Sequence, residues 1–271
     1  MNFIQNQYAG QREQRGAVWL TAHGSNAVHS VSSAVNPDDG STANVYTQIV
    51  EGTVLAKRDD TGLHYPCAAD AAQATVTTAN SIVVADVLQF AIGQLVELPT
   101  SVSANAARFR LVTAINYDTS TITLDGATFS LTTGQAIEVD GGRSLVLAAA
   151  AVTASTALTV SAEDAAKLAV GDTLSFTADT DKTITAIAGT AITLSGAVTI
   201  ADNSRIVSNS DGDYKITTKT VTIDDNKFVP QNVLIPTRPI GRVKEILVVG
   251  LTATSKAALT GRIIFDARTI A

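Results

Sequence analysis

Apolar and small polar residues alternate along much of this chain with a period of two, the pattern of strands that are buried on one face. The clearest example is residues 183–197, TITAIAGTAITLSGA, where Ile and Leu alternate with Thr, Ser or Ala on both sides of a glycine. This pattern predicts a β-hairpin that turns at the glycine. Residues 111–127, LVTAINYDTSTITLDGA, repeat this pattern and predict a second hairpin of the same kind.

The segments around the two hairpins also match in order, which predicts a duplicated β-module. The offset between matched segments changes from 76 to 78 and then to 72 and 70. Such drift is expected when loops change length while strands keep their register. The matched segments are 81–84 with 157–160, 90–98 with 168–176, the two hairpins, and 136–139 with 204–207.

The flanking sequence predicts a separate β-rich body, made from residues 46–78 and 210–271 on either side of the duplication. Copy one is then expected over residues 79–142 and copy two over residues 143–209, each a small β-barrel or sandwich. Ala, Glu and Lys favour one helical turn at 162–168, with an equivalent turn at 85–90. In the body, residues 214–223 alternate cleanly and predict one long strand, while 252–260 can be a loop or a turn of helix. The predicted fold class is therefore all-β.

The first 45 residues are polar and turn-rich, with few apolar side chains. This composition is typical of an extended arm that orders against a partner. The alternative is a frayed terminus that contributes one strand to the sheet. If the segment is an arm, its apolar side chains are the candidate partner contacts. These are Phe3, Ile4, Tyr8, Val18, Trp19 and Leu20.

Composition narrows the class of protein further. Charged residues are only 16% of the chain and the net charge is −6, which argues against direct nucleic-acid binding. The longest apolar run, residues 145–152, is too short for a membrane span and predicts a buried strand. The N-terminus lacks the layout of a signal peptide, so synthesis in a cytoplasm without export is expected. The single cysteine, Cys67, excludes an intrachain disulfide and is expected in or near a core.

No residue pattern predicts catalysis, a metal or a cofactor, so a non-enzymatic protein is expected. The histidines, His23, His29 and His64, lack metal-ligand spacing and are expected to be solvated or locally hydrogen-bonded. The acidic pairs in polar loops, at 179/181, 211/213 and 224/225, favour side-chain-capped turns over calcium binding. Residues 141–144, GGRS, lack the spacing of a phosphate-binding loop and predict a linker turn between the copies.

Two stretches of the predicted body resemble the head decoration, or capsid cement, proteins of tailed bacteriophages. The first is residues 51–57, EGTVLAK, followed by Tyr65 and Pro66. It departs from the family pattern at Ala56, where glycine is usual, and in the missing residue between Tyr65 and Pro66. The second runs from residues 246–247 through 252–254 and 258–259 to 262–267, and looks like the family's closing strand pair around an Ala/Thr segment.

The resemblance implies a virion structural protein that binds the outer surface of a capsid and stabilises the shell by bridging capsomers. Its partner would be the major capsid protein, reached through the N-terminal arm, and it would act as a homo-oligomer such as a trimer. The duplicated copies would project outward, like the small β-barrel modules of phage virion proteins. The alternative is a tail or fibre protein whose copies bind a host receptor or glycan, although copy two carries only one aromatic residue, Phe176.

Overall fold

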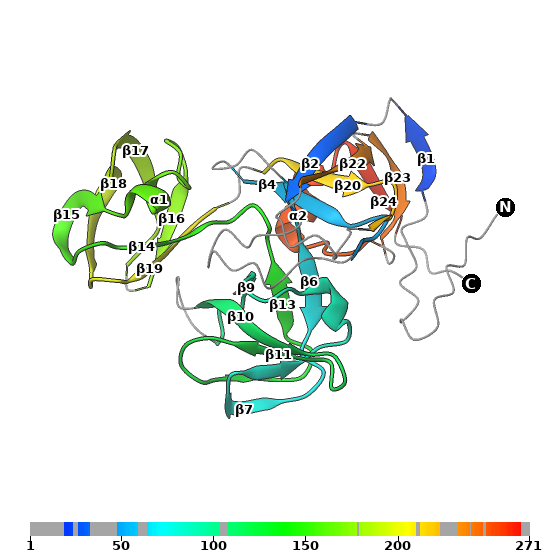
Figure 1. Ribbon diagram of the computed structural model, residues 1–271, viewed down its shortest axis with the longest axis horizontal. Helices are drawn as coiled ribbons and strands as arrows, with labels where there is room; N and C mark the ends of the chain where they lie inside the picture. Colours follow the sequence, from blue (N-terminus) through cyan, green and yellow to red (C-terminus); the bar gives the residue numbers. More distant parts are fainter. Residues whose placement is uncertain are drawn as a thin grey trace.

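The chain folds into three β-rich units that form separate lobes in Figure 1. The computed structural model describes residues 19–23, 27–32, 48–58, 64–102, 108–177, 179–209, 212–222, 232–238, 240–245 and 248–266. We call residues 68–139 module one, residues 145–208 module two, and the remaining described strands and helix the body. Strands dominate all three units, which confirms the all-β class.

Both modules contain a six-stranded antiparallel sheet with the same strand order. In module one the order is β6-β13-β9-β10-β11-β8, and in module two it is β14-β19-β16-β17-β18-β15. Each strand therefore has a counterpart at the same place in the other sheet. The bounds in module one are β6 Ala68–Ala71, β7 Val76–Ala79, β8 Ser81–Val83, β9 Leu95–Glu97, β10 Phe109–Asn116, β11 Thr121–Leu124, β12 Phe129–Leu131 and β13 Ala136–Val139. Those in module two are β14 Leu145–Leu147, β15 Val152–Thr159, β16 Thr173–Phe176, β17 Lys182–Ala188, β18 Ala191–Ile200 and β19 Arg205–Ser208.

The two predicted hairpins are confirmed as β10–β11 and β17–β18, and they share a β-bulge. The register shifts after Val112 in the first hairpin and after Ile184 in the second. At each bulge a threonine hydroxyl donates to a carbonyl across the hairpin: Thr113 to residue 123, and Thr185 to residue 193, both at 3.2 Å. Because a bulge is a local irregularity, its recurrence with the same hydrogen bond argues strongly for duplication.

A second irregularity is also repeated. Thr78 and Ala154 both have positive φ, of 48° and 45°, which residues with a Cβ rarely adopt. In each case the backbone N–H of this residue donates to a hydroxyl on the neighbouring strand, that of Ser130 or Thr199. The same unfavourable backbone state with the same partner in both modules indicates that the copies keep one backbone path.

The predicted helical turns are both present, as α1 (Ala162–Ala165) in module two and the 3₁₀ turn η1 (Val87–Gln89) in module one. The predicted match of 136–139 with 204–207 is wrong by one residue. Glu138 pairs with Glu97 and Val207 pairs with Ser175, so residue 138 corresponds to 207. A shift of one residue would send every side chain to the opposite face of the strand.

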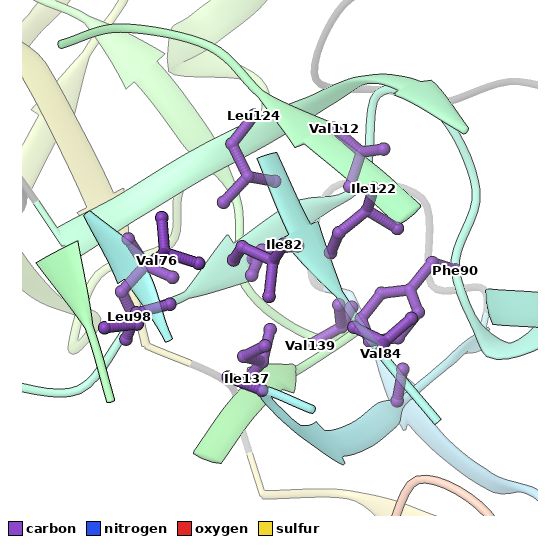
Figure 2. Close-up of a cluster of buried hydrophobic side chains, with 14 of the residues drawn as sticks. Val76, Ile82, Val84, Phe90, Leu98, Val112, Ile122, Leu124, Ile137 and Val139 are labelled. Atoms are coloured by element: carbon purple, nitrogen blue, oxygen red, sulfur yellow. The ribbon is translucent and has the colours of Figure 1, made fainter. Parts of the chain in front are cut away.

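Each module encloses its own apolar core. Along β18 the buried residues alternate with exposed Thr, Ser and Ala, as the sequence pattern predicts. Figure 2 shows the core of module one, where side chains from β7 to β13 point toward one another. Phe176 is the fully buried aromatic of module two, at 0% exposure. The interiors are thus filled with side chains.

The body combines a closed five-stranded barrel, ordered β2-β22-β20-β4-β5, with the sheet β1-β23-β24 and the pair β3–β21. Its bounds are β1 Trp19–His23, β2 Ala27–Ser32, β3 Gln48–Ile49, β4 Val54–Lys57, β5 His64–Pro66, β20 Tyr214–Thr217, β21 Val221–Thr222, β22 Asn232–Arg238, β23 Ile240–Lys244, α2 Ala253–Leu259 and β24 Ile263–Asp266. The strand predicted over 214–223 is therefore interrupted: β20 belongs to the barrel and β21 to the pair with β3. The ambiguous segment at 252–260 is the helix α2, which begins with a capping box at Thr252 and Ser255.

The pairing of strands also shows to which unit the segments near the expected domain boundaries belong. β6 and all of β7 except its last residue lie within the range 46–78, yet these strands pair with β13 and β12 of module one. Within the predicted N-terminal arm, β1 pairs with β23 and β2 pairs with β22, so these two segments are strands of the body. The rest of residues 1–45 lies outside the described residues.

Candidate functional site

The candidate capsid-contact residues are only partly within the described structure. Phe3, Ile4, Tyr8 and Val18 lie outside the described residues. Trp19 and Leu20 begin strand β1, in which Trp19 pairs with Val243 of β23. Strand β1 thereby connects the N-terminal segment to the C-terminal strands of the body. The role of these six residues as partner contacts stays a prediction.

The best-defined polar site in the structure is the junction where the three units meet, centred on Asp140. This residue follows β13 at the end of module one and is 7% exposed. Its Oδ2 accepts a 2.6 Å hydrogen bond from the hydroxyl of Tyr214, which lies in β20 of the body. Its Oδ1 accepts a 3.0 Å hydrogen bond from the backbone N–H of Gly142, in the linker to module two. One buried carboxylate therefore joins the end of module one to the body and to the linker that leads into module two.

Two arginines extend this site across Phe109, a 0%-exposed residue of module one. The guanidinium carbons of Arg108 and Arg143 lie 4.6 and 5.1 Å from the centre of the Phe109 ring. Both arginines also pair with Glu97, Arg108 at 2.9 Å and Arg143 at 3.5 Å. Arg143 Nε is 3.9 Å from Asp140 Oδ2. Ring contact and shared carboxylates hold the guanidinium planes in fixed orientations.

Burial governs the electrostatics of the junction. Removal from water raises the pKa of Asp140 above its ordinary value, although the Arg143 charge and the Tyr214 and Gly142 hydrogen bonds oppose the shift. Burial likewise raises the pKa of Glu138, with a further contribution from Glu97. The junction thus holds more carboxylate charge than its environment fully compensates, which makes it sensitive to the loss of any donor.

The backbone segments that lead into and out of module one lie very close to each other. A Cβ on Gly141 would lie 2.5 Å from the carbonyl oxygen of Tyr65, which is too short for any real contact. A Cβ on Gly250 would lie 2.0 Å from the carbonyl oxygen of Cys67, and Gly250 has a φ of +72°. Glycine is required at both places because backbone segments from distant parts of the chain touch there. Cys67 itself is 1% exposed and unpaired, as predicted for a core cysteine.

The two modules also contact each other directly. Leu95 and Phe109 of module one pack with Leu145 and Val207 of module two in one buried cluster. Beside it, the guanidinium of Arg205 forms a bidentate ion pair with the carboxylate of Asp125 and donates to the carbonyl of residue 109 at 3.1 Å. The modules are therefore packed against each other as well as joined by a linker.

The predicted linker turn at 141–144 is a turn, but its role in the junction is a feature that the sequence reasoning missed. Ser144 accepts a 2.7 Å hydrogen bond from the buried Arg58 of the body. The sequence contains one indication of the junction, because Asp140 and Arg143 lie between two predicted buried strands. A charged residue in such a place needs a partner.

The remaining candidates for chemistry are dispersed. His64 is 4% exposed, and its Nε2 lies 3.6 Å from the carboxylate of Asp213. The side chains of His23 and His29 lie outside what the structure describes. Among the described residues, no three His, Cys, Asp or Glu side chains are grouped so that they could hold a metal ion.

Comparisons with known proteins add no relative. No family model matches the chain, and the searches of curated proteins and of solved structures found no match either. Within the described part of the chain, the helices are too short to cross a membrane.

Proposed function

We propose that this chain is a non-enzymatic structural protein of a phage virion, which binds the outer surface of the capsid and stabilises the shell by bridging capsomers. The partner is the major capsid protein, and the bound form is a homo-oligomer such as a trimer. The proposal assigns no catalytic, metal-binding or cofactor-binding residue. Binding only to the assembled shell would stabilise that shell by mass action.

The observation that carries the proposal is that the two stretches resembling capsid decoration proteins belong to one folded unit. The first stretch supplies β4 and the second supplies α2 and β24, almost 200 positions later in the chain. They meet in one core, in which Val54 and Ala56 pack with Leu259 and Ile263. The backbone of Val54 also donates to the carbonyl of residue 249 at 2.9 Å. The segments that carry the resemblance therefore lie together in one folded unit, although they are far apart in the sequence.

The arrangement of the modules supports the same proposal. Gly141, at the exit of module one, touches the backbone at Tyr65 and Pro66, at its entrance. Insertions are well tolerated where their ends lie this close together, because the host fold need not deform. A capsid-binding body that carries two inserted modules is consistent with this geometry.

The decisive experiment is to count the copies of the chain in purified particles of the phage that encodes it. Quantitative mass spectrometry against the major capsid protein would give hundreds of copies for a shell-bound protein. Electron cryo-microscopy of the same particles should then place density for the chain on the outside of the shell. A chain that is absent from particles, or present in a handful of copies on the tail, would refute the capsid assignment.

The second candidate, a tail or fibre protein with glycan-binding copies, is less well supported by the side chains. Carbohydrate sites usually present exposed aromatic rings, yet Phe176, the aromatic of module two, is fully buried. In module one, Phe90, Phe109 and Phe129 are also buried, whereas Tyr117 is 62% exposed. A symmetric pair of glycan sites therefore lacks its aromatic platform in module two.

A further inference from the structure

A cation occupies the same place in both modules, Arg110 in module one and Lys182 in module two. Each lies two residues before the position at which the bulge of its hairpin begins. Each side chain also lies against a glycine. A Cβ on Gly126 would overlap Nη1 of Arg110, and a Cβ on Gly196 would lie 3.2 Å from Cδ and Cε of Lys182. Both copies have therefore kept a cation and the glycine that it covers.

In module two this cation has a carboxylate partner. Nζ of Lys182 lies 3.3 Å from Oδ1 of Asp179 and donates to the carbonyl of Thr180 at 3.2 Å. The Asp179 carboxylate also accepts from the backbone N–H groups of Thr180 and Thr199, at 2.7 and 3.1 Å. These hydrogen bonds hold the pKa of Asp179 below its ordinary value, so the carboxylate stays ionised beside the cation. Cation and anion are thus matched in module two.

In module one the corresponding carboxylate is missing. The sequence before β10, residues 99–107, is PTSVSANAA and contains no acidic residue. Among the residues that the structure describes, the guanidinium of Arg110 has no hydrogen-bond or ion-pair partner, and its Nε is buried. Asp125 is already engaged, because it forms the bidentate pair with Arg205 and accepts from the backbone N–H of Leu111 at 2.9 Å. Arg110 is therefore a partly buried cation without a counter-ion of its own.

The surroundings of Arg110 contribute more positive than negative charge. Burial and the charge of Arg205 lower the pKa of Arg110, and the opposing effect of Asp125 is smaller. Two guanidinium groups thus share one carboxylate where the modules meet. The side chains of Arg205 and Asp125 are 26% and 21% exposed, so an ion from solution can reach this place. An excess of positive charge in a partly buried position attracts an anion.

We propose that Arg110 is the centre of an oxyanion-binding site, in which a phosphate or sulfate ion takes the place that the Asp179 carboxylate fills in module two. A guanidinium group binds such oxygens through two parallel N–H bonds. The second donor corresponds to the backbone N–H of Thr199. Its counterpart in module one is that of Ser130, because the hydroxyls of these two residues accept the same bond from the residue with positive φ. The bound ion would also offset the charge of Arg205 and so strengthen the contact between the modules. This inference is independent of the proposed function.

The test is isothermal titration calorimetry of the full-length chain with inorganic phosphate and, separately, with sulfate. Ionic strength is kept constant with chloride, so that a general salt effect is the same in every titration. The chains compared are the wild type, Arg110→Gln and Lys182→Gln. Lys182→Gln is the matched control, because it removes the corresponding cation from the module in which Asp179 already supplies the carboxylate. Thermal unfolding in chloride verifies that each variant is folded.

We expect the wild type to bind one oxyanion with a Kd of about 1 mM or lower, Arg110→Gln to bind it at least about 10-fold more weakly, and Lys182→Gln to bind it as the wild type does. The ion should also raise the midpoint of thermal unfolding of the wild type above that in chloride, and Arg110→Gln should lose this increase. No saturable binding by the wild type, equal binding by Arg110→Gln, or an equal loss in Lys182→Gln would each overturn the proposal.

A gain of binding tests the comparison between the modules. Asp179→Ala removes the carboxylate beside Lys182 and should leave this cation in the state of Arg110, so this variant is expected to bind two oxyanions per chain. A variant that still binds only one would show that the carboxylate does not mark the place of the ion, and the inference would fail. Should Arg110→Gln unfold, Arg110→Lys decides the outcome, because it keeps the charge but loses the two parallel donors and should therefore weaken binding.

Discussion

The substitution Tyr214→Phe tests how strongly the buried junction joins module one to the body. It removes one hydroxyl group and keeps the ring, which is 1% exposed and packs in the core of the body. The lost hydrogen bond, 2.6 Å long, is donated to the buried carboxylate of Asp140. Bonds to charged groups contribute about 1.5–3 kcal/mol, so we expect a destabilisation of about 2 kcal/mol. This corresponds to roughly a 30-fold change in the unfolding equilibrium.

The expected loss also depends on pH in a defined direction. The Tyr214 hydrogen bond lowers the pKa of Asp140, so its removal raises that pKa further. A donor to a carboxylate matters most when the carboxylate is ionised. The destabilisation should therefore be larger at pH 8 than at pH 4. A cause unrelated to Asp140, such as altered ring packing, would give the same loss at both values.

The measurement is urea unfolding of the full chain, followed by the fluorescence of Trp19, the only tryptophan, in β1 of the body. Because the chain has three units, circular dichroism must be recorded in parallel to separate the unfolding of the modules. In an Asp140→Asn background the same tyrosine change should cost less than about 1 kcal/mol. A loss below about 0.5 kcal/mol in the wild-type background, or one of equal size in both backgrounds, would refute the reasoning.

Three further predictions concern the core, the close contacts and the charge of the junction. Phe176→Ala should destabilise module two by about 3–5 kcal/mol in calorimetry, and a loss near zero would contradict the buried position. Gly250→Ala should cost more than about 3 kcal/mol, because its Cβ would overlap the carbonyl of Cys67, whereas Gly134→Ala, with φ of +86° but open space, should cost about 1–2 kcal/mol. Equal losses at the two glycines would contradict the close approach. Because the folded pKa of Asp140 is raised above 3.8, its contribution to stability should fall as pH rises from 3.8 through the folded pKa. Asp140→Asn should flatten that fall in a series of thermal unfolding curves, and an unchanged slope would refute the assignment to this residue.

The repeat and its strands could be predicted from the sequence because they depend on local patterns. The alternation predicted the two hairpins, and the changes in offset between the copies marked where their loops differ in length. The change from 72 to 70 marks the hairpin loop that carries Tyr117, which is two residues longer in module one. The closing strand was misaligned by one residue because its short match offered no alternation strong enough to fix the register. Only the pairing of Glu138 with Glu97 resolves it.

The closed barrel and the junction could not be predicted in the same way, because they depend on contacts between distant segments. Nothing in the local pattern of residues 214–223 signals that its first half joins a barrel and its second half pairs with β3. Similarly, Asp140 and Tyr214 are 74 positions apart, and their bond depends on the relative placement of module one and the body. Long-range polar pairs of this kind have no periodic signature in a single sequence.

The strands of the body come from segments before and after the two modules in the sequence, and this order affects how the chain folds. Residue 53 bonds to residue 217 across 164 positions, and both modules are synthesised between them. Each module is contiguous and can fold as soon as it is made, whereas the barrel must wait for its last strands. Folded modules whose ends lie together shorten the effective loop, which lowers the entropic cost of closing the barrel. We therefore expect the barrel to close last, after β22 has been made, so a product truncated before residue 232 would carry folded modules without a completed barrel.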